Sequence, residues 1–241
     1  MIPCVAEPVI LCLETSTPRA SVALLRGAEV LFEAAFTSDR SHNSGLFAPL
    51  QEALASLLDG EPLACVVVGT GPGSYSGTRV GIAAAQGVAM VHGCPAVGLS
   101  SLAAVPLAAF PALAVGDARR GTFWWAWVKP GKAVPEPDLG SVEELERVLV
   151  PQLDYHLPAF SLESLEKSGL DAALRNRVEL LMPDATLLGR AWQALNPAEQ
   201  EILAVLPPQP VYLRPPHITE AKGGHPLVTA GRRSEPNPSL P

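Results

Sequence analysis

Two segments of the chain carry residue types that could bind a phosphate or another anion. The first is an apolar run that ends in an acidic residue and is followed by hydroxyl residues. The second is a glycine-rich turn before a helix-like stretch. Hydroxyl groups and the unpaired backbone N–H groups of a helix start are common anion ligands. The candidate nucleotide or anion contacts are Glu14, Thr15, Ser16, Gly71, Gly73 and Ser74. The alternative is that the first two of them only cap a turn.

Catalytic and metal-binding patterns are not found in the sequence. The five histidines are scattered, with no HxxxH or HExxH spacing. A nucleophile elbow needs a serine at the centre of residues 73–77, where this chain has Tyr75. A phosphate-binding P-loop needs a lysine after its last glycine, but Thr78 follows Gly77. We therefore nominate no catalytic residue and no metal ligand.

Composition limits the classes of function. The chain has 241 residues, of which 48% are hydrophobic, and this length suits two modest domains or two lobes of one fold. Its formal net charge is −7 and it has no basic run, so it is a poor candidate for binding nucleic acid by itself. The four cysteines lack CxxC spacing, and no signal peptide or membrane-spanning run is evident. We expect a cytoplasmic protein with reduced thiols.

The elements that position the candidate contacts can be read from apolar periodicity. Three apolar runs with short links, at residues 9–13, 20–25 and 29–36, predict an antiparallel meander. A β-branched run at residues 65–68, the glycine-rich turn and a helix over residues 77–91 follow. The first acidic residue thus stands at a strand end, and the glycines stand before a helix start.

Two helices are expected to form one layer. Residues 41–58 have leucines at helical spacing, which predicts an amphipathic helix. In the helix at 77–91, Gly77, Gly81 and Ala85 recur every four residues and therefore share one face. A face without side chains allows close approach of a neighbour. That neighbour is either a helix of another protein or this chain's own sheet, and the spacing alone does not separate the two.

The second half repeats the opening theme. An apolar run ends in Asp117, a turn follows, and residues 122–128 form a strand with three tryptophans. This strand is either a stacking platform or a covered strand. Further helices are expected at 100–109, 141–149 and 189–206, and helical turns at 163–168 and 170–177. The repetition predicts an α/β protein with lobes at residues 1–109 and 110–216, and a Pro- and Gly-rich disordered tail at 217–241.

Six segments occur in an order that resembles a known family. They are ILCLETSTPRASVALL, SHNSGLFAPL, VVGTGPGSYSGTRVGIAAAQGVA, VGLSSL, GDARRGTFWWA and PVYLR. Together they resemble the TsaB (YeaZ) family, the dimerisation subunit of the bacterial tRNA threonylcarbamoyladenosine synthase. The resemblance implies an actin/Hsp70-like (ASKHA, ribonuclease H-like) fold, with a mixed sheet and flanking helices in each of two lobes.

The same resemblance implies a relationship to TsaD, the catalytic paralogue, which holds a metal through an HxxxH motif. The matching positions here carry Ser101 and Val105. A valine and an isolated serine do not replace imidazole ligands. The resemblance therefore implies a non-catalytic subunit that supports threonylcarbamoyl transfer to the adenosine beside the anticodon.

The partners implied are a TsaD-like catalytic subunit, a TsaE-like ATPase, a second copy of this chain when partners are absent, and tRNA only through the complex. No cofactor is assigned to this chain, and ATP or ADP is expected at a complex interface. The expected interface residues are Leu46, Leu50, Leu54, Gly77, Gly81, Ala84, Ala85 and Val88. On this basis Gly81→Arg should abolish pairing without unfolding the monomer. The alternatives are a degenerate or metal-independent peptidase of the glycoprotease type and a stand-alone nucleotide-binding protein.

Overall fold

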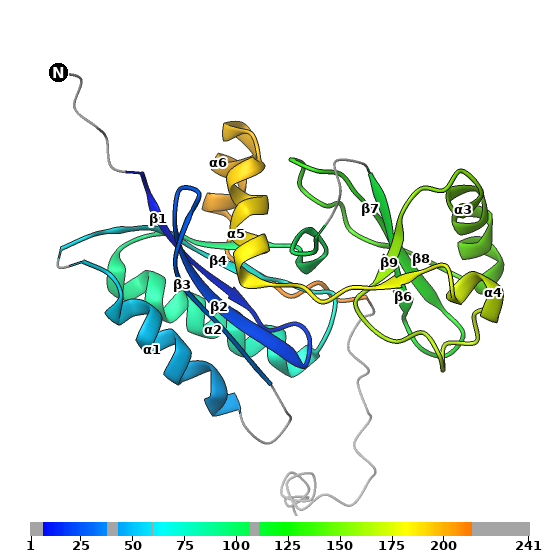
Figure 1. Ribbon diagram of the computed structural model, residues 1–241, viewed down its shortest axis with the longest axis horizontal. Coiled ribbons are helices and arrows are strands. Elements are labelled where there is room, and N and C mark those ends of the chain that lie inside the picture. Colours follow the sequence, from blue (N-terminus) through cyan, green and yellow to red (C-terminus); the bar gives the residue numbers. More distant parts are fainter. Residues whose placement is uncertain (1–6, 38–42, 59, 107–110, 214–241) are drawn as a thin grey trace, which may run out of the picture.

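The computed structural model describes residues 7–37, 43–58, 60–106 and 111–213, and in this part of the chain two β-sheets lie side by side (Figure 1). Helices pack against both sheets, so the molecule is α/β. Within the described ranges, no helix combines the length and the apolar character needed to cross a bilayer. The predicted tail at 217–241 lies outside the described residues.

The first sheet confirms the predicted meander. β1 (Val9–Glu14), β2 (Arg19–Arg26) and β3 (Glu29–Thr37) are antiparallel neighbours. β4 (Leu63–Gly69) runs parallel to β1, and β5 (Ala96–Leu99) runs parallel to β4. The order is β3-β2-β1-β4-β5. All six residues of β1 are buried, as expected for a central strand that is covered on both faces.

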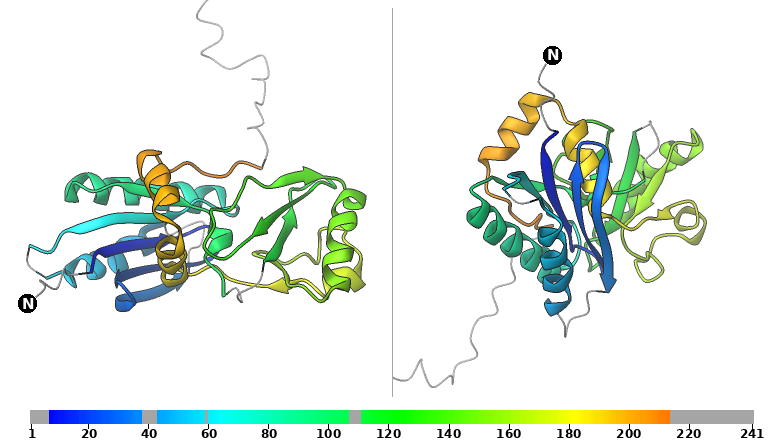
Figure 2. Two further views of the ribbon diagram at one scale, coloured as in Figure 1. Left: turned by 90° about the horizontal axis from the view of Figure 1, so that it is seen from above. Right: turned by 60° about the vertical axis from the view of Figure 1, so that its left-hand side comes forward.

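Two helical layers cover this sheet. The 3-10 turn η1 (Asn43–Leu46), α1 (Phe47–Ala55) and α2 (Tyr75–His92) form one layer. α5 (Ala185–Ala194) and α6 (Pro197–Val205) lie on the opposite face, as Figures 1 and 2 show. The first sheet is therefore buried between α1–α2 and α5–α6.

The second sheet repeats the strand order of the first. β6 (Ala112–Asp117), β7 (Phe123–Val128) and β8 (Asp138–Gly140) form a meander. β9 (Ala159–Ser161) pairs parallel with β6, and β10 (Glu179–Leu180) pairs parallel with β9. The order β8-β7-β6-β9-β10 corresponds to β3-β2-β1-β4-β5. This duplication confirms the two related lobes and the actin/Hsp70-like (ASKHA, ribonuclease H-like) fold.

The helices of the second lobe correspond to α1 and α2 by their place in the chain. α3 (Val142–Asp154) begins with a capping box in which Ser141 and Glu144 bond each other's backbone N–H. It packs three buried leucines against the sheet. α4 (Ala172–Arg175) has only four residues, whereas its counterpart α2 has 18. The long helix is therefore a feature of the first lobe.

Several sequence expectations need correction. Residues 100–109 were expected to be helical, but only the 3-10 turn η2 (Ser101–Ala103) forms before the residues that are not described. Residues 163–168 form turns without a helix. Pro197 starts α6 and divides the expected helix at 189–206, because proline lacks the N–H that a helix interior needs. The division into lobes at residues 1–109 and 110–216 stays a prediction. Within the second range, α5 and α6 pack against the first sheet.

Candidate functional site

The β1–β2 turn is bonded directly to the start of α2. The Thr15 hydroxyl donates a hydrogen bond of 2.8 Å to the carbonyl oxygen of Gly77. The backbone N–H of Ser74 donates to the carbonyl oxygen of Ser16 at 2.6 Å. Ser74 also caps α2, because its hydroxyl accepts from the N–H of Gly77 at 3.2 Å. The two segments nominated from the sequence therefore meet, and two hydrogen bonds join them.

Glycines in α2 and just before it make this contact possible. A Cβ atom at Gly73 would collide with the carbonyl oxygen of Ser16, and one at Gly77 with the carbonyl oxygen of Thr15. A Cβ atom at Gly81 would meet the Thr15 hydroxyl oxygen. The small residues spaced four apart therefore accommodate this chain's own β1–β2 turn.

This geometry places most of the predicted interface residues inside the first lobe, and their role in an interface stays a prediction. Among the eight, Leu46, Leu50, Gly77, Gly81 and Ala85 are buried inside the first lobe, while Leu54, Ala84 and Val88 are partly buried. The expectation that Gly81→Arg spares the fold conflicts with this geometry, since the arginine side chain would start inside the contact with the β1–β2 turn. The face of α2 that the sequence favoured points toward its own sheet.

The opposite face of α2 carries exposed apolar residues. Met90 and Val91 are each 83% exposed, and Ala83 and Gly87 are exposed beside them. We call these four residues the outer α2 stripe. Sequence reasoning overlooked the stripe, although a signal existed. Only Arg79 and His92 are basic or acidic residues in the whole helix, so its small and apolar residues extend beyond one face.

Glu14 is a buried acid with a structural hydrogen bond. Its Oε1 atom accepts from the N–H of Ser16 at 2.7 Å, while Oε2 has no hydrogen-bond partner among the described residues. Burial raises the pKa of the Glu14 carboxyl, and hydrogen bonds from Ser16 oppose that shift. The missing side chain of Gly69 makes the room that this carboxyl group occupies.

The two positions that the resemblance matches to the metal ligands of the catalytic paralogue carry Ser101 and Val105. The Ser101 hydroxyl accepts a 3.0 Å hydrogen bond from the N–H of Gly71, and Val105 is a buried core residue. No group of three or more His, Cys, Asp and Glu side chains in the described ranges could hold a metal ion. The residues present do not fit the paralogue's metal.

A cavity of about 670 Å³ lies between the lobes. From the first lobe it is lined by the β1–β2 turn and the start of α2, and from the second by Asp117, Arg119, Trp124 and Glu163. Of the six candidate anion contacts, Ser16, Gly73 and Ser74 line this cavity, whereas Glu14, Thr15 and Gly71 do not. Their role as nucleotide contacts stays a prediction.

The second lobe presents acids to the same cavity. Asp117 ends β6 as Glu14 ends β1, which matches the duplication. Arg119 contacts Asp117 at 3.0 Å and Glu163 at 3.2 Å. Burial raises the pKa of Glu163, although the N–H of Asp117 and the charge of Arg119 oppose the shift. Glu163 was missed from the sequence. The sequence feature that could have indicated it is its position just after β9, the strand that corresponds to β4 of the first lobe.

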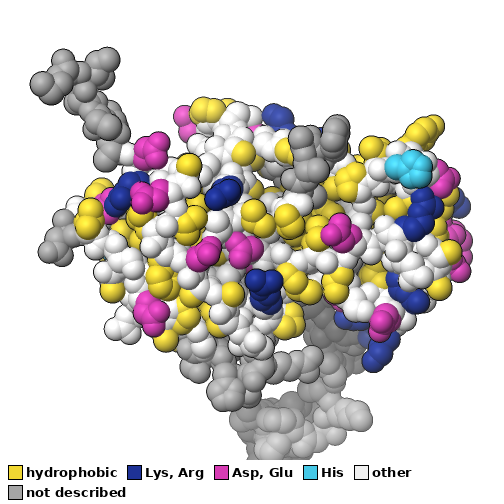
Figure 3. Space-filling view, in the orientation of Figure 1, with side chains coloured by type: hydrophobic (Ala, Val, Ile, Leu, Met, Phe, Trp, Pro, Cys, Tyr) yellow, Lys and Arg dark blue, Asp and Glu magenta, His cyan; other side chains and the backbone are white. Residues whose placement is uncertain are grey.

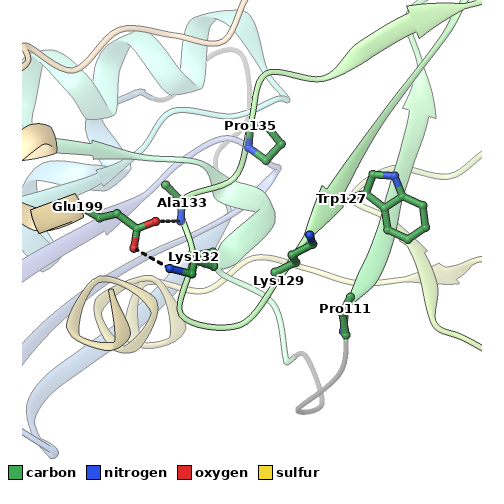
Figure 4. Close-up of a pocket in the computed structure, with 7 residues that line it drawn as sticks. All are labelled: Pro111, Trp127, Lys129, Lys132, Ala133, Pro135 and Glu199. Carbon is green, nitrogen blue, oxygen red and sulfur yellow. Dashed lines mark hydrogen bonds and ion pairs between the residues drawn. The ribbon is translucent and has the colours of Figure 1, made fainter. Parts of the chain in front are cut away.

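A second large cavity, of about 650 Å³, involves none of the predicted site residues (Figure 4). Its lining residues are Pro111, Trp127, Lys129, Lys132, Ala133, Pro135 and Glu199. Lys132 and Glu199 point toward one another across it, with their charged atoms 3.9 Å apart (Figure 4). Trp127 is 37% exposed while Trp124 and Trp125 are buried, so most of the tryptophan strand is covered.

Two related lobes with a cleft between them define a protein of the ASKHA class, and the comparisons narrow this to one family. The family model described as "TsaD: tRNA N6-adenosine threonylcarbamoyltransferase" matches residues 31–206. The TsaB protein of Escherichia coli is 32% identical over 230 residues, which cover 85% of this chain and 94% of that protein. TsaB of Haemophilus influenzae is 38% identical over 103 residues, or 42% of this chain and 43% of that one. The solved structure of YeaZ from Pseudomonas aeruginosa matches with a TM-score of 0.61 and 25% identity, covering 86% of this chain and all of that chain. The chain belongs to the TsaB (YeaZ) family.

Proposed function

We propose that this chain is a non-catalytic subunit in tRNA threonylcarbamoyladenosine biosynthesis, and that it pairs with a TsaD-like catalytic subunit through α1 and α2. The observation that carries this proposal is the outer α2 stripe. Large apolar side chains such as Met90 and Val91 project into solvent from a helix whose other face is fully packed. Apolar groups exposed together typically mark a surface that a partner covers.

The similarity between the two subunits supports this pairing mode. The match to the TsaD family model covers residues 31–206, which include α1 and α2 together with β4 and β5 of the sheet beneath them. Two chains of the same architecture can therefore bring equivalent helix pairs together across an approximate two-fold axis. The same surface would pair with a second copy of this chain when the catalytic subunit is absent.

The division of labour follows from residue types. The serine and valine at the paralogue's metal-ligand positions leave the transfer chemistry to the partner, together with any ATP-dependent step of a TsaE-like ATPase. On the face shown in Figure 3, Lys and Arg side chains are interspersed with Asp and Glu. Such a mixed surface on a chain of net charge −7 suits a cytoplasmic subunit that reaches tRNA through the complex.

Light scattering after size exclusion tests this proposal. The full chain is mixed with the TsaD-like subunit encoded in the same genome, and each protein is also run alone. We expect a heterodimer with one copy of each chain, and a weaker self-associated species of this chain alone. Two separate monomeric peaks at concentrations well above micromolar would overturn the proposal.

A further inference from the structure

Two family segments that lie far apart in the sequence meet on the surface. Tyr75 and Arg79 belong to the glycine-rich segment at the start of α2, and Tyr212 belongs to the last described residues. The Arg79 guanidinium lies over the Tyr75 ring, 4.2 Å from its centroid. Its Nη2 and Nε atoms donate to the Tyr212 hydroxyl at 2.7 and 3.2 Å. We call these three residues the tyrosine–arginine cluster.

The cluster is anchored and yet exposed. The segment that presents Tyr212 is fixed by a 2.9 Å hydrogen bond from the N–H of Val211 to the carbonyl oxygen of Thr70. A cavity of about 280 Å³ separates this segment from α2. Tyr75 is 58% exposed and Tyr212 is 47% exposed. The rings are therefore held in place while much of their surface faces solvent.

The cluster continues the outer α2 stripe. Arg79 lies four residues before Ala83 and eleven before Met90, spacings that keep all three on one side of the helix. The apolar residues occupy the C-terminal part of this side, and the cluster occupies its N-terminal end. A partner that covers the stripe along its length reaches Arg79.

The charge of Arg79 has no carboxylate partner among the residues that the structure describes. Tyr212 uses the Nε–Nη2 edge of the guanidinium, so the Nη1–Nη2 edge is left for a second acceptor. Arginine binds a carboxylate bidentately through such an edge. Because two tyrosines already hold the side chain, little conformational entropy is lost when it binds.

We propose that the tyrosine–arginine cluster is the polar anchor of the subunit interface, where Arg79 binds a carboxylate of the TsaD-like partner. This inference rests on the proposed function. Arginine and tyrosine are enriched among the residues that dominate interface energies. A protein partner is favoured over RNA because the continuous neighbour of Arg79 is an apolar stripe, which a protein covers and a phosphate backbone does not.

The experiment measures the Kd of the full chain with the TsaD-like subunit for three substitutions. Arg79→Glu should weaken binding by about 100-fold, because the carboxylates would then repel each other. Arg79→Lys should weaken it by about tenfold, since an ammonium group cannot bind a carboxylate bidentately. Arg190→Glu is the matched control: Arg190 is exposed on α5 across the sheet, so Kd should stay within about twofold. Exchange of the facing partner carboxylate for arginine should restore binding to Arg79→Glu.

The outcomes separate this inference from the proposed function. If the wild-type chain forms no complex, both fail. If Met90→Asp abolishes the complex while Arg79→Glu binds like wild type, the interface stands and the inference about Arg79 is wrong. If Arg79→Glu leaves protein pairing intact but lowers retention of tRNA, Arg79 binds RNA. If the substitution breaks only self-association, Arg79 binds a second copy of this chain. Either result overturns the proposal.

Discussion

At the scale of single residues, the β1–β2 turn can approach α2 closely because glycines of the helix face its backbone atoms. At Gly77 the neighbour is a carbonyl oxygen of Thr15, which cannot rotate away as a side chain does. Gly87 lies on the outer side of the same helix, and a Cβ atom there would have no neighbouring heavy atom within 4 Å. These two glycines lie in one helix and differ only in what surrounds them.

Gly77→Ala is therefore expected to lower the free energy of unfolding by about 1–3 kcal/mol, the typical cost of overpacking. Gly87→Ala should instead raise it by about 0.5–1 kcal/mol, because alanine favours the helix and meets no obstacle. Urea denaturation of both variants measures the difference. Equal effects of the two substitutions would show that the contact with Thr15 is not tight.

The buried carboxyl of Glu14 predicts a pH dependence of stability. Its folded-state pKa is raised above the ordinary value of 4.5, so the folded protein keeps a proton that the unfolded chain releases. Stability is therefore lost as pH rises from about 4.5 toward the raised pKa. Glu14→Gln cannot ionise, and its stability relative to wild type should increase over this interval. The prediction would be contradicted if the free energies of unfolding of the two proteins changed with pH in parallel.

The residue scale also shows what a sequence can and cannot specify. Glycines four apart in a helix indicate that something approaches closely, and this was confirmed. The pattern does not say what approaches, because a turn of the same chain and a helix of another protein need the same space. The identity of the neighbour depends on where residues 62 positions earlier fold, as the hydrogen bond between Thr15 and Gly77 shows.

At the scale of elements, α2 packs on one side and is apolar on the other. β1, β2, β4 and α2 were predictable because each has enough buried residues to give a clear apolar run or period in the sequence. β8, β10 and α4 contain three, two and four residues, so no period could reveal them. The exposed side of α2 was overlooked because the expected partner interface was placed on the face with the smallest residues, Gly77, Gly81 and Ala85.

Met90→Asp on α2 should abolish the complex with the TsaD-like subunit, since it places a charge in an apolar contact. Val205→Asp is the matched control, because Val205 is also a strongly exposed apolar residue but lies on α6, across the sheet. Isothermal titration should find wild-type affinity for Val205→Asp. Similar losses for both variants would indicate general destabilisation and not a defined surface.

At the scale of the whole molecule, the two lobes share one architecture but differ in the length of their helices. Both lobes share a strand order, but the long helix is present only in the first, where α2 has 18 residues against four in α4. The return of α5 and α6 to the first sheet leaves α1 and α2 as the outward layer on its other face. The duplication was visible in the sequence as two acid-ended strands, whereas the return of the C-terminal helices was not, because amphipathic helices do not encode which sheet they cover.

The most direct test of the account is reconstituted modification of tRNA. The TsaD-like and TsaE-like proteins, tRNA, ATP and threonylcarbamoyl-adenylate are combined with the wild-type chain, Val205→Asp, Met90→Asp or no chain, and modified adenosine is measured over time. The account predicts modification with the wild-type chain and Val205→Asp, and little with Met90→Asp or without the chain. Equal modification in all four mixtures would contradict it.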